Sequence, residues 1–251
     1  WNPDLKDMES KINVATKAIL VINPNNPTGA VYSKETLLKI ADLARKYNLV
    51  LLSDEIYDRL VMDGLQHVAT ASLAPDLTVV TMNGLSKSHS LCGYRCGWMV
   101  ISGPRARTEE YRKGIVQLTS LRLCSNALAQ LVIPAAMEDM ETPASMIRPG
   151  GRIYEQRQAT IEVLKDIPGL SFVKNVAAFY MFPRLDAIAA HFGGYGMYET
   201  AFELLRDKDC IFDVSSSLMF MEPNLAEELI NLYGAERFMY GTDYPMWDPV
   251  E

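Results

Sequence analysis

Runs of apolar residues alternate with amphipathic stretches over the first hundred positions. Residues 18–22, 48–54 and 77–82 are rich in β-branched and aliphatic side chains, which predicts buried strands. Between the first two runs, Ser33 opens a stretch whose apolar positions recur at helical spacing. Strand, helix and strand in this order predict a parallel sheet, and residues 97–102 predict a fourth strand.

The middle of the chain predicts helices and then a smaller α+β segment. Residues 105–140 predict a long helix that Pro134 breaks or kinks, and residues 153–166 predict an amphipathic helix. Residues 170–173 and 179–182 predict two short strands. The fold class that follows is α/β, with a parallel or mixed sheet in a large domain and a small α+β segment after it.

Polar side chains follow each of the first three predicted strands. Asn26 lies in the turn after the first strand, Asp54 ends the second, and Lys87 lies in the loop after the third. In parallel sheets, ligands bind beyond the carboxyl ends of the strands. We therefore expect these three side chains to share one site.

The loop of residues 83–97 carries the most specific chemistry. A lysine that is buried at the end of a strand has a lowered pKa, and its amine becomes a nucleophile for aldehydes. Arg95 follows Lys87 by eight residues, and a fixed guanidinium suits a phosphate. An aldehyde and a phosphate together describe pyridoxal 5'-phosphate. The alternative is a solvated Ser/Lys loop followed by an arginine with a structural role.

Composition and charge narrow the choice of function classes. The 251 residues allow one large domain or two modest ones, and the net charge of −7 argues against a nucleic-acid surface. The four cysteines lack a paired spacing, which favours reduced thiols and a cytoplasmic location. We expect no membrane partner, since no apolar run reaches spanning length and no signal peptide is present. The start at Trp1 indicates a fragment or a processed chain.

Four motifs together resemble the fold-type I pyridoxal-phosphate aminotransferases, and within them the alanine-aminotransferase-like group. They are Asn-Pro-Asn-Asn-Pro-Thr-Gly at 23–29, Ser-Asp-Glu-Ile-Tyr at 53–57, the loop from Ser86-Lys87 to Arg95-Cys96-Gly97-Trp98, and Ala-Phe-Tyr-Met-Phe-Pro at 178–183. The resemblance runs from residue 1 to about 186. It implies amino-group transfer between an amino acid and a 2-oxo acid, of the alanine and 2-oxoglutarate type, by an enzyme that forms homodimers.

The resemblance assigns catalysis to Lys87, and cofactor binding to Lys87 and Asp54. Lys87 matches the lysine that bonds covalently to the cofactor and later moves a proton at the α-carbon of the amino acid. Asp54 matches the carboxylate that pairs with the pyridine nitrogen and keeps it protonated. The alternative for Asp54 is a helix cap.

The resemblance assigns cofactor binding to four more positions. Asn26 and Tyr57 match the pair that hydrogen-bonds the phenolic oxygen of the ring. Arg95 matches the phosphate-binding arginine, and Ser86 is a second phosphate donor. Taken singly, Asn26 is also explained as a turn residue and Tyr57 as a packing aromatic.

The chain departs from the family pattern at three places. Gly84 stands three positions before the lysine, where related enzymes often have a phosphate-binding serine. The N-terminal third of the family, with its phosphate loop and the aromatic that stacks on the ring, is absent. The C-terminal arginine that grips the substrate carboxylate is absent too, which predicts weak substrate binding.

Residues 188–251 predict a second pattern of strand, helix, strand, helix and strand. With Gly-Thr-Asp-Tyr-Pro at 241–245, this tail resembles the last strands of an amidohydrolase-type TIM barrel. His191 and Asp243 match its metal-facing positions, but the paired histidines of the early strands are absent. We therefore predict no metal site, with His191 and Asp243 as the only weak candidates.

The predicted domains are a truncated cofactor-binding domain at 1–140, a partial small domain at 141–187 and the amidohydrolase-like segment at 188–251. The junction near 187 has three explanations: a fusion, an artefact of sequence assembly, or a divergent aminotransferase ending. The Gly-Thr-Asp-Tyr-Pro motif favours the first two. The leading function is that of an aminotransferase. The alternatives are a metal-dependent hydrolase or decarboxylase fragment and a non-catalytic fragment.

Overall fold

The computed structural model describes residues 1–239 apart from 168, 169, 186, 190, 195, 208, 209, 215–217, 219 and 220. The chain divides into two compact units. The first contains residues 1–158 and 174–182, and the second contains residues 159–173 and the part from 183 onward. The three domains predicted above stay a prediction.

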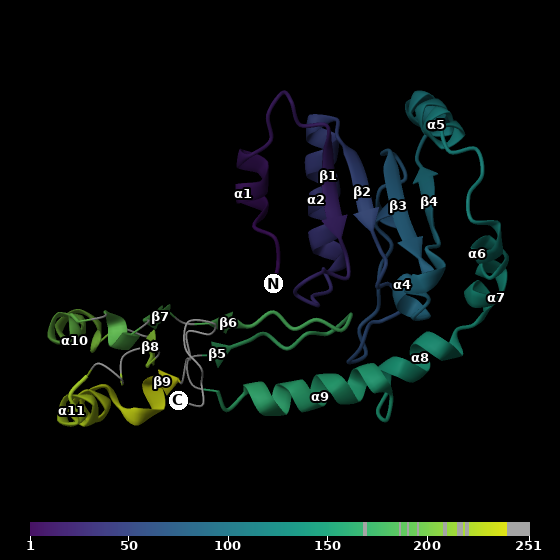
Figure 1. Cartoon of the computed structure of the whole chain (residues 1–251). Helices are drawn as coiled ribbons and strands as arrows, with labels where there is room; N and C mark the ends of the chain where they lie inside the picture. The colour runs from purple at the N-terminus through teal and green to yellow at the C-terminus, as the bar shows by residue number, and fades with distance from the viewer. Residues whose placement is uncertain are drawn as a thin grey trace. The chain divides into compact units, whose positions relative to one another are not determined.

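A four-stranded mixed sheet forms the centre of the first unit. Its order is β1-β2-β3-β4, with bounds Ala18–Ile22, Val50–Asp54, Val79–Gly84 and Gly97–Ser102. The predicted parallel pairing of the first three strands is confirmed, and β4 runs antiparallel to β3 (Figure 1). The direction of β4 agrees with its connection, because the twelve residues between Gly84 and Gly97 contain no helix long enough to serve as a crossover between parallel strands. They form only the short helix α4 (Leu85–Ser88) and the 3₁₀ turn η1 (Cys92–Tyr94).

Helix α2 (Lys34–Tyr47) begins and ends where the sequence predicts. The Ser33 hydroxyl accepts a hydrogen bond from the Thr36 amide at 3.1 Å, and Asn48 closes the helix in the left-handed conformation. Its apolar face is fully buried against β1 and β2 side chains, among them Ile19 and Leu51. This packing holds the carboxyl ends of the strands in place.

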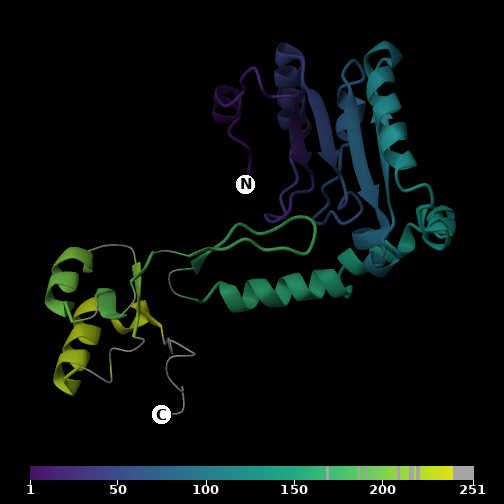
Figure 2. The ribbon, with the colours of Figure 1, turned by 45° about the horizontal axis from the view of Figure 1, so that its top comes forward.

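The first unit contains further short and long helices besides α2. Helix α2 lies on the β1 side of the sheet and α5 on the β4 side (Figure 2). The bounds are α1 Leu5–Ser10, α3 Thr70–Leu73, α5 Arg105–Ser120, α6 Ala127–Leu131, α7 Ile133–Glu138 and α8 Glu141–Ile147, and α9 (Arg152–Leu164) follows. The predicted break near Pro134 is confirmed, since α7 starts there, but the chain also leaves the helix between α5 and α6.

The predicted strand at residues 179–182 is wrong. That segment contains no strand, and the short strand β5 (Leu170–Ser171) pairs instead with β6 (Arg184–Leu185). Upstream of the segment, Ala177 forms a single antiparallel bridge with Val61. The aromatic side chains of Phe179 and Tyr180 instead contact the ring of Tyr57.

The second unit contains the predicted strand–helix pattern. Strands β7 (Ala187–Ala189), β8 (Cys210–Asp213) and β9 (Phe238–Met239) are parallel and adjacent in that order. Helices α10 (Tyr198–Leu205) and α11 (Pro223–Tyr233) connect them, and 3₁₀ turns lie at His191–Gly193 and Ala235–Arg237. Buried Phe192, Phe212 and Tyr233 form its core.

Both metal candidates of the tail fall outside what can be tested. Asp243 and the His191 side chain do not belong to the described residues. Across the described ranges, no three His, Cys, Asp or Glu side chains are grouped so that they could hold a metal ion. Within the same ranges, no helix has both the length and the apolar composition needed to cross a membrane.

Candidate active site

A cavity of about 430 Å³ opens at the carboxyl ends of β1, β2 and β3. All six predicted site residues line it: Asn26, Asp54, Tyr57, Ser86, Lys87 and Arg95. The other lining residues are Ile22, Ile56, Met82, Asn83 and Cys92. The volume is in the range of small-molecule and cofactor sites.

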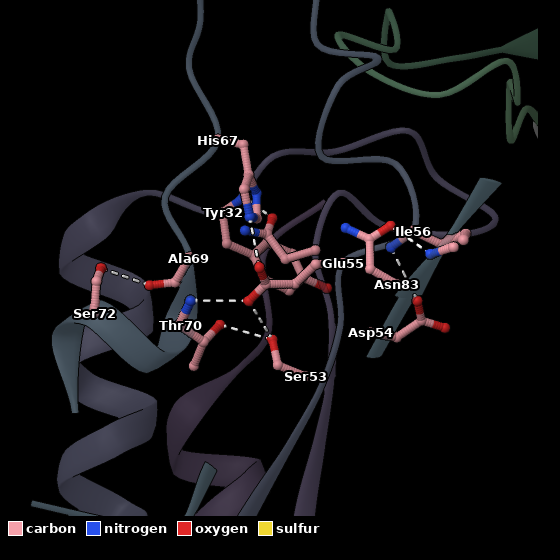
Figure 3. Close-up of polar contacts among 12 residues, drawn as sticks. Tyr32, Ser53, Asp54, Glu55, Ile56, His67, Ala69, Thr70, Ser72 and Asn83 are labelled. Atoms are coloured by element: carbon pink, nitrogen blue, oxygen red, sulfur yellow. Dashed lines mark hydrogen bonds and ion pairs between the residues drawn. The ribbon is translucent and has the colours of Figure 1, made fainter. Parts of the chain in front are cut away.

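Strand β2 directs Asp54 and its neighbours to opposite sides. Asp54 is its last residue and is half-buried, with its Oδ1 accepting a hydrogen bond from the Ile56 amide at 3.1 Å. Figure 3 shows Asp54 on the side of Asn83, whereas Ser53 and Glu55 point away from it. The alternation of side chains along a strand produces this separation. A carboxylate therefore faces the cavity, and a second carboxylate lies in the protein interior.

Lys87 lies in α4, which begins directly after β3. Its side chain is half-buried, and its Nζ lies 5.9 Å from the ring centroid of Tyr57 and 5.6 Å from that of Phe179. These distances are within the range of cation–π contacts. The lysine thus lies near two aromatic rings, one of which, Tyr57, lines the cavity with it, and this argues against the alternative of a solvated loop.

Arg95 and Asn26 occupy the exposed rim. Arg95 has a left-handed backbone with φ of 52°, and its Nη1 donates to the Cys92 carbonyl at 2.9 Å. This bond uses one of the five guanidinium donors and leaves the others for a bound molecule. Asn26 stands before Pro27 in the loop that follows β1. Both side chains are reachable by a bound molecule.

Tyr57 is buried and joins the cavity to the segment of residues 174–182. Its hydroxyl oxygen lies 2.6 Å from that of Tyr180, and its ring meets Phe179 and Tyr180 edge-on. Burial raises the pKa of Tyr57, and the Tyr180 hydroxyl and the Asp54 carboxylate raise it further. Tyr57 therefore keeps its proton at neutral pH.

Glu55 is the centre of a buried polar cluster that the sequence interpretation missed. One carboxylate oxygen accepts from the Ser53 hydroxyl at 2.8 Å and the Thr70 amide at 2.9 Å, and the other lies 2.9 Å from His67 Nε2 (Figure 3). Burial raises the pKa of Glu55, but the bonds from His67 and Thr70 outweigh it and leave the pKa below its usual value. Glu55 is therefore ionised at neutral pH, and it anchors the end of β2 to the start of α3.

Phe179, Tyr180 and Asn83 were also missed as site residues. Asn83 lines the cavity, and its Oδ1 accepts from the Gly84 amide at 2.7 Å, at the start of α4. Its place directly before the lysine loop was the available signal. The two aromatics belong to a quoted motif, but their approach to Lys87 and Tyr57 depends on the fold.

The groups that line the cavity suit a phosphorylated pyridine aldehyde. Lys87 offers an amine to an aldehyde, Arg95 offers a cation to a phosphate, and Asp54 offers an anion to a protonated ring nitrogen. Ser86 and Tyr57 add hydroxyl groups. Each of these groups would contact a different part of such a ligand. The set therefore indicates the ligand more specifically than any single residue does.

Comparison with known proteins decides the family. The sequence profile of aminotransferase class I and II matches residues 1–214. This chain belongs to the class I and II aminotransferases. Members of this family use pyridoxal phosphate, so the resemblance found in the four motifs is confirmed.

Among relatives of this aminotransferase chain are two named enzymes. It is 49% identical over 187 residues to glutamate-pyruvate aminotransferase AlaA of Escherichia coli strain K12, covering 74% of this chain and 46% of the relative. It is 50% identical over 186 residues to the alanine aminotransferase of Mycobacterium tuberculosis strain H37Rv, covering 74% and 43%. The chain therefore spans about half the length of the curated relatives it matches.

Solved structures agree with the fold of this aminotransferase chain. An aminotransferase from Escherichia coli superposes with a TM-score of 0.72 at 49% identity, over 74% of this chain and 46% of the other. The alanine aminotransferase from Pyrococcus furiosus superposes with a TM-score of 0.70 at 40% identity, over 74% and 47%. The α/β fold with a mixed sheet is thus confirmed.

The family match also bears on the tail. It continues to residue 214, past the junction expected near 187, and so includes β7 and β8. The resemblance of the tail to an amidohydrolase barrel is not confirmed by any of these comparisons. A divergent aminotransferase ending, the third explanation of the junction, agrees best with the extent of the match.

Proposed function

We propose that this chain carries the pyridoxal-phosphate-binding half of an aminotransferase that exchanges an amino group between an amino acid and a 2-oxo acid. The observation that carries the proposal is the convergence of Lys87, Asp54 and Arg95 on one cavity at the strand ends. The names of the relatives support alanine with 2-oxoglutarate, or glutamate with pyruvate in reverse, as the substrates. The homodimer implied by the resemblance and the cytoplasmic location favoured by the unpaired cysteines belong to the same proposal.

The residues divide the work of holding the cofactor. Arg95 and Ser86 bind its phosphate, Asp54 pairs with the ring nitrogen, and Asn26 and Tyr57 donate to the phenolic oxygen. When bound, the cofactor supplies an electron sink for the charge that develops at the substrate α-carbon. A carboxylate beside the ring nitrogen stabilises its protonated form, on which that sink depends.

Lys87 has two roles in this proposal. With the cofactor bound, the Lys87 Nζ would be the amine that holds its aldehyde group covalently. Once a substrate amine has replaced it, the free Nζ would accept and return the proton at the substrate α-carbon. The nearby Tyr57 and Phe179 rings restrict where Nζ can lie.

A trapping experiment tests the proposal. Purified chain is mixed with pyridoxal phosphate, its visible absorbance is recorded, and the adduct is reduced with borohydride and mapped by peptide mass spectrometry. We expect a visible band and a reduced adduct on Lys87. A folded chain with no band, or with the adduct spread over exposed lysines, would contradict the proposal.

Replacing Asp54 by asparagine is expected to weaken cofactor binding about 10- to 100-fold, because a hydrogen bond between charged groups contributes roughly 1.5–3 kcal/mol. Asparagine keeps the shape of the side chain and removes its charge. The measurement is a fluorescence titration with pyridoxal phosphate. Asp42→Asn, on the exposed side of α2, is the matched control. Equal affinity of the Asp54 variant and the unaltered chain would refute the pairing with the ring nitrogen.

A further inference from the structure

Tyr180 lies next to the cavity without lining it. Its hydroxyl oxygen lies 2.6 Å from that of Tyr57, which does line the cavity. The two residues are 123 positions apart in the chain, and their rings meet at 80° with centroids 5.6 Å apart. A hydrogen bond this short between two partly buried phenols fixes both side chains.

The backbone around Tyr180 is held by the loop that carries Asn26. The Gly29 carbonyl accepts hydrogen bonds from the amides of Val176 and Ala177, both at 3.0 Å. A Cβ atom on Gly29 would lie 2.5 Å from Asn175 Cβ and 3.0 Å from the Tyr180 carbonyl oxygen. Glycine is required for this close approach, and so the position of Tyr180 is set by the cofactor loop itself.

Counting protons leaves two possible directions for this hydrogen bond. Each phenol has one proton, so only one of the two can donate to the other, and the second proton goes to a third group. Tyr57 lines the cavity and Tyr180 does not, so the Tyr57 hydroxyl is the one that a molecule bound there can reach. The arrangement that leaves a proton directed into the cavity is donation from Tyr180 to Tyr57.

We propose that Tyr180 is a positioning residue, which donates its hydroxyl proton to the Tyr57 oxygen and so aims the Tyr57 proton at the phenolic oxygen of the bound cofactor. This inference rests on the proposed function, because it assigns Tyr57 a bound pyridoxal phosphate as its partner. Tyr180 itself touches neither substrate nor cofactor. Its effect is on how well Tyr57 stabilises the deprotonated phenolic oxygen.

The test is the pH dependence of the visible spectrum of the cofactor-loaded chain. A donor on the phenolic oxygen favours its deprotonated form and lowers the midpoint of the spectral change. Tyr180→Phe keeps the ring and every backbone contact, and we expect it to raise the midpoint by about 0.5 to 1 pH unit, the equivalent of one typical hydrogen bond. Tyr57→Phe sets the upper limit of the shift, and Tyr111→Phe on α5 is the control.

A double variant shows whether Tyr180 acts through Tyr57. The midpoint of Tyr57→Phe/Tyr180→Phe is expected to equal that of Tyr57→Phe alone, since the second change then has nothing left to act on. An additional shift in the double variant would overturn the inference, as would a Tyr180→Phe midpoint equal to or below that of the unaltered chain. Absence of a band in the unaltered chain would contradict the proposed function, and this inference with it.

Discussion

Replacing Lys87 by alanine is expected to abolish the covalent adduct with pyridoxal phosphate. Covalent capture of an aldehyde needs an amine that the fold holds beside it, and Lys87 is the lysine that lines the cavity. Borohydride reduction followed by intact-mass measurement should show the added cofactor mass on the unaltered chain and none on the variant. Non-covalent binding through Arg95 and Asp54 should survive at reduced affinity, visible as quenching of tryptophan fluorescence.

Two controls make this result specific. Lys113→Ala removes an exposed lysine on α5, which is paired with Glu110, and should leave the adduct unchanged. Lys87→Arg keeps the positive charge but offers no amine, so it should lose the adduct as completely as the alanine variant. An adduct that persists in both Lys87 variants would mean that another lysine captures the cofactor and that the site lies elsewhere.

The sheet, and the grouping of the candidate site residues at one of its edges, could be predicted because local signals were strong. Strands β1 and β2 bury alternate side chains, β3 buries Val79 and Val80, and such apolar runs between polar turns indicate strands. The residues that follow them could be placed together because parallel strands end at one edge. Asn26, Asp54 and Lys87 therefore came together from sequence order alone.

What could not be predicted depends on contacts between distant segments. Residues 179–182 alternate aromatic and aliphatic side chains as a strand does, but their backbone neighbours are fixed by Gly29 and the Val61 region more than a hundred positions earlier. No local pattern shows that Tyr180 will meet Tyr57. The Lys87 environment was likewise expected to be buried, whereas the structure places that side chain half-buried between two rings.

The adjacent acids Asp54 and Glu55 also differ in a way that the sequence could not predict. In the sequence they are adjacent carboxylates, and the family motif assigns a role to the first alone. In the structure they face opposite sides of the strand end, one toward the cofactor cavity and one into the polar cluster with His67 (Figure 3). A motif that serves binding therefore also contains the residue that holds the binding residue in place.

The Glu55→Ala substitution is expected to lower the free energy of unfolding by about 3 kcal/mol at neutral pH, because a buried donor left without its partner costs roughly 1–3 kcal/mol. It leaves the Ser53 hydroxyl, the Thr70 amide and His67 without their common acceptor. Urea denaturation of the unaltered chain and the variant measures the difference. Glu35→Ala, which removes an exposed glutamate paired with Lys39, should change stability by only about 0.3–0.5 kcal/mol.

The pH dependence of this difference separates a charge effect from a packing effect. The pKa of Glu55 is lowered on folding, so its contribution is fully present above the ordinary glutamate pKa and is lost as the pH falls through the folded-state pKa. The stability gap between the unaltered chain and Glu55→Ala should therefore be constant from pH 6 upward toward neutrality, on the order of the value above, and should narrow in acid. A gap that stays the same down to the acid transition would mean that the carboxylate contributes only by filling space. In that case the end of β2, and Asp54 with it, would be held by the sheet alone.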